Sequence, residues 1–90
     1  MDLAKRYRIE KDKIMQRIND DEVVILNLDT GDCYSLNEVG TKIWLAIQEN
    51  KSLDEIFTLI KEEYDISEKR FKKDIFKLVT ELEKNGLIRN

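Results

Sequence analysis

The fold is decided by the stretch Asp29–Trp44, which reads Asp-Thr-Gly-Asp-Cys-Tyr-Ser-Leu-Asn-Glu-Val-Gly-Thr-Lys-Ile-Trp. Its first four residues have the composition of a hairpin turn, because Gly31 can adopt a positive φ without a steric penalty and aspartates can bond to the local backbone. Asn37 is a typical helix N-cap, whose side-chain oxygen accepts a bond from a free backbone N–H. The segment between them, Asp32–Leu36, is therefore predicted to be a strand, with strands before it and helices after it.

Upstream of the turn, Glu22–Leu28 is the strongest strand signal in the chain, because it is apolar on both faces. Its alternate side chains form two sets: Val24, Leu26 and Leu28, and Val23 and Ile25. This pattern predicts the central strand of a three-stranded antiparallel meander. Helices can cover one face, whereas the other needs the N-terminal segment or a second subunit, so a homodimer is permitted.

The N-terminal segment alternates apolar and polar residues over Tyr7–Glu10 and again over Ile14–Ile18. Lys11–Lys13 interrupts the alternation. Two interpretations remain open, one strand with an irregularity or two short strands.

Downstream of Asn37 the apolar residues recur with the period of helices. The second helix is expected to begin with a capping box made by Ser52 and Glu55. The third is expected to follow Ser67 as its N-cap and to end at Gly86, a typical residue after a helix C-terminus. Three strands followed by three helices predict an α+β, winged-helix-like fold with the helices on one side of the sheet.

The composition limits the classes of function. Ninety residues fit a single domain, residues 1–90. The formal net charge is −3, and the 16 basic and 19 acidic residues are interspersed, which does not favour nucleic acid as a partner. No apolar run is long enough for a membrane span or a signal peptide, and the single cysteine cannot form an internal disulfide. We therefore expect a cytoplasmic protein with a reduced thiol and no membrane partner.

No set of residues predicts an active site. The chain has no histidine, so the commonest general base and the commonest metal ligand are both missing. Cys33 has no base beside it, and the neighbouring aspartates disfavour its thiolate. Cys33 is interpreted as a small residue on a sheet face, and we expect neither an enzyme nor a metal or cofactor.

Basic residues near the start of the third helix indicate an alternative function. They are Lys69, Arg70, Lys72, Lys73 and Lys77. A recognition helix in a small winged-helix DNA-binding regulator carries such residues. Acidic residues on the same helix reduce the positive field, so a solvated helix face is preferred. Phe76 lies off the apolar face, and it either packs on a neighbouring element or is exposed to meet a partner.

The unpaired edge of the last strand, Asp32–Leu36, is the strongest candidate binding surface. Such an edge can accept the backbone of another chain as an added strand. Alternation places Tyr34 and Leu36 on one face of this strand, and Tyr34 can be shared between the core and a groove. Trp44 is expected in the core.

Several segments in this order and spacing resemble the pyrroloquinoline quinone biosynthesis protein D (PqqD-like) family. They are Leu26–Gly40 with Ile43-Trp44, Ser52–Ile56, Glu63–Ile66 and Leu82–Ile88. The resemblance implies a stand-alone recognition element for ribosomally synthesised, post-translationally modified peptides. Such an element binds the leader segment of a precursor peptide without catalysis and presents it to a modifying enzyme, for example a leader peptidase or a radical SAM enzyme. The chain lacks the proline-containing strand associated with quinone-cofactor synthesis, so the product class stays open between a lasso peptide and a radical-modified peptide.

The resemblance also implies where the leader binds. It would add as a strand to the edge of Asp32–Leu36 and lie against the third helix, Phe71–Leu82. Either flank of that helix can face the groove, one lined by Arg70, Asp74 and Lys77 and the other by Phe76 and Val79, and the first is chosen. The expected peptide-binding residues are Asp32, Cys33, Tyr34, Ser35, Leu36, Arg70, Phe71, Asp74 and Lys77.

Overall fold

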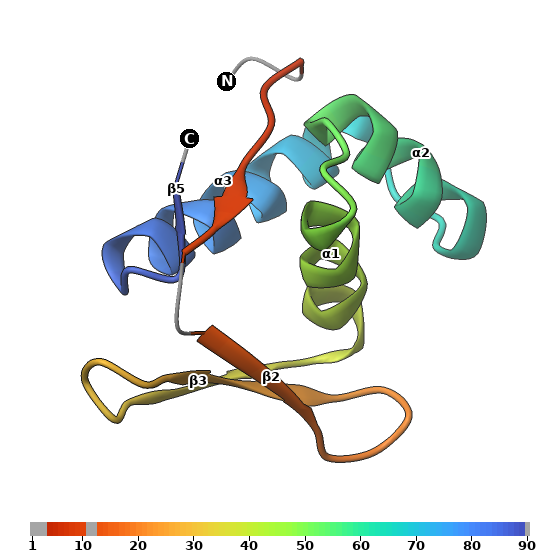
Figure 1. The fold of residues 1–90 in the computed structure, drawn as a ribbon. Coiled ribbons are helices and arrows are strands. Elements are labelled where there is room, and N and C mark those ends of the chain that lie inside the picture. The colour runs from red at the N-terminus through yellow and green to blue at the C-terminus, as the bar shows by residue number, and fades with distance from the viewer. Residues whose placement is uncertain (1–3, 11–12, 90) are drawn as a thin grey trace.

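The computed structural model describes residues 4–10 and 13–89. In chain order its elements are β1 (Arg8–Ile9), β2 (Lys13–Arg17), β3 (Val23–Asn27), β4 (Cys33–Leu36), α1 (Glu38–Gln48), α2 (Leu53–Glu63), α3 (Glu68–Lys84) and β5 (Ile88–Arg89). Strands β2, β3 and β4 form an antiparallel sheet in that order, and all three helices lie on one side of it (Figure 1). The predicted α+β architecture, a three-stranded sheet followed by three helices, is confirmed.

The turn between β3 and β4 forms where the sequence predicts it. The Asn27 N–H donates to the Asp32 carbonyl at 2.9 Å, and the Gly31 N–H donates to the Asn27 carbonyl at 2.7 Å. Gly31 has φ of 80°, the left-handed conformation that glycine adopts without strain. Leu28, predicted as a strand residue, is instead part of the turn, because the Asn27 carbonyl already accepts the bond that closes it.

The N-terminal segment contains two strands that belong to different sheets. β2 is an edge of the main sheet, whereas β1 pairs antiparallel with β5, with Ile9 opposite Ile88. The Glu10 N–H extends this pairing by donating to the Leu87 carbonyl at 3.0 Å. The second of the two interpretations is therefore correct. Lys11 and Asp12, part of the predicted interruption, lie outside the described residues.

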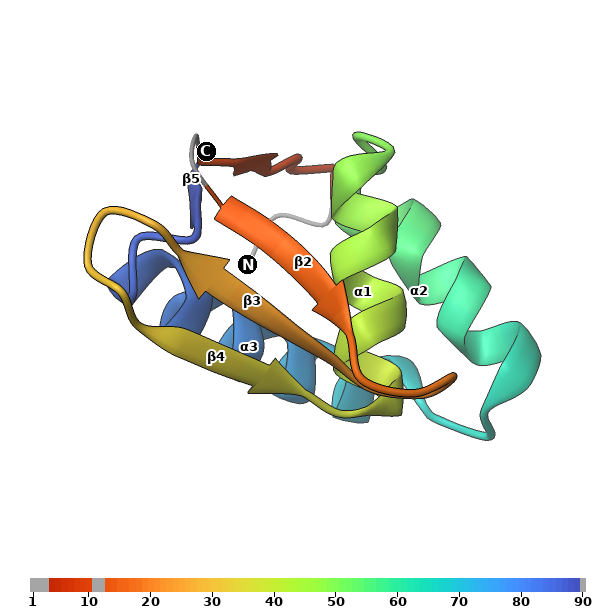
Figure 2. The ribbon, with the colours of Figure 1, turned by 60° about the horizontal axis from the view of Figure 1, so that its bottom comes forward.

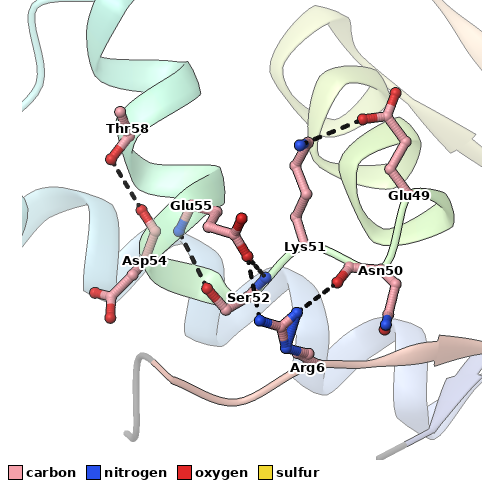
Figure 3. Close-up of polar contacts among 8 residues, drawn as sticks. All are labelled: Arg6, Glu49, Asn50, Lys51, Ser52, Asp54, Glu55 and Thr58. Carbon is pink, nitrogen blue, oxygen red and sulfur yellow. Dashed lines mark hydrogen bonds and ion pairs between the residues drawn. The ribbon is translucent and has the colours of Figure 1, made fainter.

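The predicted capping box at the start of α2 also anchors the N-terminal segment (Figure 3). The Glu55 N–H donates to Ser52 Oγ at 3.3 Å, and the Ser52 N–H donates to Glu55 Oε1 at 2.9 Å. Arg6 approaches the same carboxylate at 3.5 Å and donates to the Asn50 carbonyl at 2.9 Å. The bonds from Ser52, and then the charges of Arg6 and Lys51, lower the pKa of the Glu55 carboxyl.

The inner face of the main sheet meets the helices in one core. Val23 and Ile25 of β3 are fully buried, and Trp44 of α1 and Phe71 of α3 are 1% and 2% exposed. Val24 and Leu26 point to the outer face and are half-buried. No described helix or strand covers that face, and β1 lies on the helical side of the sheet (Figure 2).

Candidate functional site

β4 presents an open edge, because in the described part of the chain it pairs only with β3. Pairs that exchange backbone bonds alternate along an antiparallel ladder with pairs that do not. Asn27 and Asp32 form a bonded pair, so Tyr34 and Leu36, which lie two and four residues after Asp32, also bond to β3. The N–H and C=O groups of Cys33 and Ser35 therefore point away from β3. An incoming strand would find two donors and two acceptors there.

A groove runs beside this edge, between β4 and α3, and encloses a cavity of about 630 Å³. α1 begins immediately after β4 because Asn37 Oδ1 accepts from the Gly40 N–H at 2.8 Å, and this corner closes one end of the cavity. A Cβ at Gly40 would lie 3.3 Å from Leu36 Cδ2, so the close packing of the corner depends on glycine. The lining residues are Tyr34, Ser35, Leu36, Asn37, Val39, Gly40, Ile43, Ile60, Tyr64, Asp65, Ile66, Arg70, Phe71, Asp74, Ile75 and Leu78.

The groove is mostly apolar, with charge at its rim. Val39, Ile66 and Leu78 are half-buried, so part of each side chain remains open to a ligand. At the rim, Arg70 Nε lies 3.1 Å from Asp74 Oδ2, and both side chains are largely exposed. The groove can therefore hold apolar side chains while the rim contacts polar or charged groups.

A hydrogen bond ties β4 to α3. The Tyr34 hydroxyl donates to Glu81 Oε2 at 2.5 Å. Burial, followed by this bond and the charge of Glu81, raises the pKa of the Tyr34 hydroxyl to about 12. The contact links the strand and the helix that form the groove.

The structure brings six of the nine expected site residues to the cavity. They are Tyr34, Ser35, Leu36, Arg70, Phe71 and Asp74. Asp32, Cys33 and Lys77 do not line it, although Cys33 contributes backbone groups to the open edge. Asp32 lies in the turn, where its N–H donates to Thr30 Oγ1 at 3.2 Å. The cavity lies on the Arg70 and Asp74 flank of α3, and Phe76 is 57% exposed on the helix surface.

Sequence reasoning missed the part of the wall supplied by α1 and by the connection from α2 to α3. Val39, Ile43, Tyr64 and Ile66 line the cavity but are not among the residues that the sequence predicted to bind a peptide. Leu78, six residues before the end of α3, is a further lining residue of this kind. One signal in the sequence could have indicated this wall. The α1 segment and the short connection carry more apolar residues than one buried stripe requires.

Metal binding, membrane insertion and DNA recognition find no support in the described residues. In that part of the chain no three acidic, histidine or cysteine residues gather to bind a metal ion. No described helix combines the length and apolar character needed to cross a bilayer. On α3, Arg70 pairs with Asp74 and Lys72 pairs with Glu68, which reduces the positive field expected of a DNA-recognition helix.

Comparison with known proteins decides the family. The profile described as Coenzyme PQQ synthesis protein D (PqqD) matches residues 22–88. The chain belongs to the PqqD family. The match covers β3, β4 and all three helices of this PqqD-family chain, and it confirms the resemblance seen in the sequence.

Two solved structures share the fold of this PqqD-family chain. One, described as TbiB1 in complex with the TbiA(beta) leader peptide, is 32% identical with a TM-score of 0.84, covering 90% of this chain and 93% of that chain. The other, described as lasso peptide synthetase B1 complexed with the leader peptide, is 22% identical with a TM-score of 0.85, covering 96% of this chain and 100% of that chain. No significant match is found among curated proteins.

Proposed function

We propose that this chain is a non-catalytic recognition module that binds the leader segment of a ribosomally made precursor peptide. The observation that carries the proposal is the open edge of β4 beside an apolar groove of about 630 Å³. The likeness to TbiB1, which was solved with a leader peptide, supports it. The leader would add as a strand to β4 and insert side chains between β4 and α3.

Backbone bonding alone gives little net affinity. The outward groups of Cys33 and Ser35 allow about four hydrogen bonds, each contributing about 1 kcal/mol net. Ordering a disordered peptide costs about 2–5 kcal/mol, which cancels most of that contribution. Submicromolar binding corresponds to more than about 8 kcal/mol, so most of the affinity must come from leader side chains in the groove.

Different residues of the groove would contact the apolar and the polar parts of the leader. Val39, Ile66 and Leu78 supply apolar surface, and Arg70 and Asp74 contact polar groups at the rim. Lys77 and Asp32 are assigned lesser, peripheral contacts because they do not line the cavity. The bound precursor would then be presented in the cytoplasm to a modifying enzyme, such as a leader peptidase or a radical SAM enzyme.

The test is an NMR titration of isotope-labelled protein with the leader peptide of its precursor, to be sought as a short open reading frame near the gene for this chain. Amide shifts are expected in β4, in the start of α1 and on the Arg70 and Asp74 flank of α3. A scrambled peptide of the same composition is the control. Absence of binding, or shifts confined to the surface around Phe76, would refute the proposal.

A further inference from the structure

No described helix or strand covers the outer face of the main sheet (Figure 2). Val24 and Leu26 of β3 are half-buried on it, and Ile18 and Leu28 at its ends are 60% and 57% exposed. Cross-strand pairing places Ser35 beside Val24 and Cys33 beside Leu26. A row of apolar side chains on β3 therefore lies next to a row of small side chains on the β4 edge. Exposed apolar surface of this kind marks an interaction site.

The charges in the turns at the ends of this face indicate what kind of partner would bind it. The turn between β2 and β3 carries Asp21 and Glu22, and the turn between β3 and β4 carries Asp29. Both ends of the face are therefore acidic. A second copy could stack on this face with its strands parallel or antiparallel to those of the first. In both arrangements its acidic turns would lie against acidic turns, which is unfavourable. A protein with an apolar patch flanked by lysines or arginines is complementary in both respects.

We infer that this outer face docks the enzyme that processes the bound precursor, an inference that rests on the proposed function. A leader strand added to β4 would extend the sheet, because side chains of a strand alternate between its faces. Those that do not enter the groove would lie in the next row beyond Cys33 and Ser35. An enzyme docked on the outer face would thus contact the module and the leader together, and its affinity should rise when the leader is bound.

The apolar part of the surface is tested with the double variant Ile18→Ser and Leu28→Ser. Both side chains are exposed, so the fold should be retained. Calorimetry measures the affinity for the purified processing enzyme encoded beside the precursor, with and without saturating leader peptide. The double variant should bind this enzyme at least about tenfold more weakly, and its leader affinity should change less than about twofold. Phe76→Ser, an equally exposed apolar residue on α3, is the matched control and should change neither affinity.

Three outcomes would overturn the inference. They are an unchanged enzyme affinity in the double variant, an equal loss in Phe76→Ser, and sedimentation showing a dimer of the unmodified chain that the double variant dissociates. The last would assign the face to a second copy. If the unmodified chain binds no leader peptide, the proposed function fails instead. The affinities for the enzyme that are measured without leader peptide still test the docking face.

The charged part has a separate test. Asp21→Lys should weaken enzyme binding severalfold, and the affinity of the unmodified chain should fall as salt is added, because salt screens exposed charges. An enzyme affinity that neither Asp21→Lys nor salt changes would contradict a basic partner surface.

Discussion

The Tyr34 hydroxyl on β4 and the Glu81 carboxylate on α3 lie 2.5 Å apart and form a hydrogen bond between the strand and the helix that border the groove. The two residues are 47 positions apart in the sequence. This bond joins the strand that offers the open edge to the helix that forms the opposite wall.

Tyr34→Phe should lower the free energy of unfolding by about 1 kcal/mol, because it removes one hydrogen bond to a charged acceptor on a partly exposed side chain. Urea denaturation measures the change. Glu81→Gln keeps an acceptor and should cost less. A Tyr34→Phe protein as stable as the unmodified chain would show that the bond contributes nothing.

The same pair predicts a dependence on alkaline pH. The pKa of Tyr34 in the folded chain is about 12, above the ordinary value of 10. The contribution of the contact to stability is therefore complete below about pH 10 and is lost as the pH rises from about 10 to about 12. Tyrosine NMR resonances followed against pH should show Tyr34 titrating above an unperturbed tyrosine. In Tyr34→Phe this late titration should be absent.

Ser35→Pro tests the addition of a strand to β4. The Ser35 N–H points away from β3, so proline should leave the sheet intact while removing a donor and placing its ring against the incoming backbone. The Kd for the leader peptide should rise about tenfold or more. Ser35→Ala keeps the N–H and is the control, with a Kd within about twofold. If both variants bind alike, the peptide does not pair with this edge.

Leu78→Ser tests the apolar wall of the groove. Leu78 is half-buried and lines the cavity, so its loss should raise the Kd for the leader about tenfold. Phe76→Ser removes a larger apolar side chain from the same helix, away from the cavity, and should leave the Kd unchanged. Equal losses in the two variants would place the peptide elsewhere on α3.

The capping box predicts weaker stability in acid. The pKa of Glu55 is lowered in the folded chain, so its contribution is present above the ordinary glutamate pKa, about 4.3, and is lost as the pH falls through the lowered value. Glu55→Gln can still accept the Ser52 bond but carries no charge. The unmodified chain should therefore be the more stable at pH 6, and the difference in urea midpoint should narrow at pH 3. Glu62→Gln, outside the box, controls for a general change of charge.

Local signals made much of this fold predictable. Asn37, Ser52 and Ser67 each accept a bond from a backbone N–H three residues later, as their positions before apolar helical patterns indicate. Gly31 marks the turn because only a few residue types tolerate its conformation. The unpaired edge of β4 followed from the order of the strands alone.

Long-range contacts were not predictable from local patterns. Pairing of β1 with β5 joins residues from opposite ends of the chain, such as Ile9 and Ile88. The alternation over Tyr7–Glu10 indicated a strand but not its partner, and β5 has no recognisable signal of its own. The cavity wall could not be assigned either, because an apolar residue such as Ile66 or Leu78 has the same pattern whether it is fully packed or half open. The contact between Tyr34 and Glu81 likewise joins residues 47 positions apart, and no local pattern encodes it.

The pairing of β1 with β5 has a consequence for how the module can be handled. The two strands lie beyond β2, on the opposite side of the molecule from β4 (Figure 2). A fluorophore, an affinity tag or a fusion partner attached at either strand would stand clear of the open edge. Because the strands run antiparallel, the start of β1 lies beside the end of β5. The domain could therefore also be inserted into a surface loop of an enzyme with little distortion of that loop.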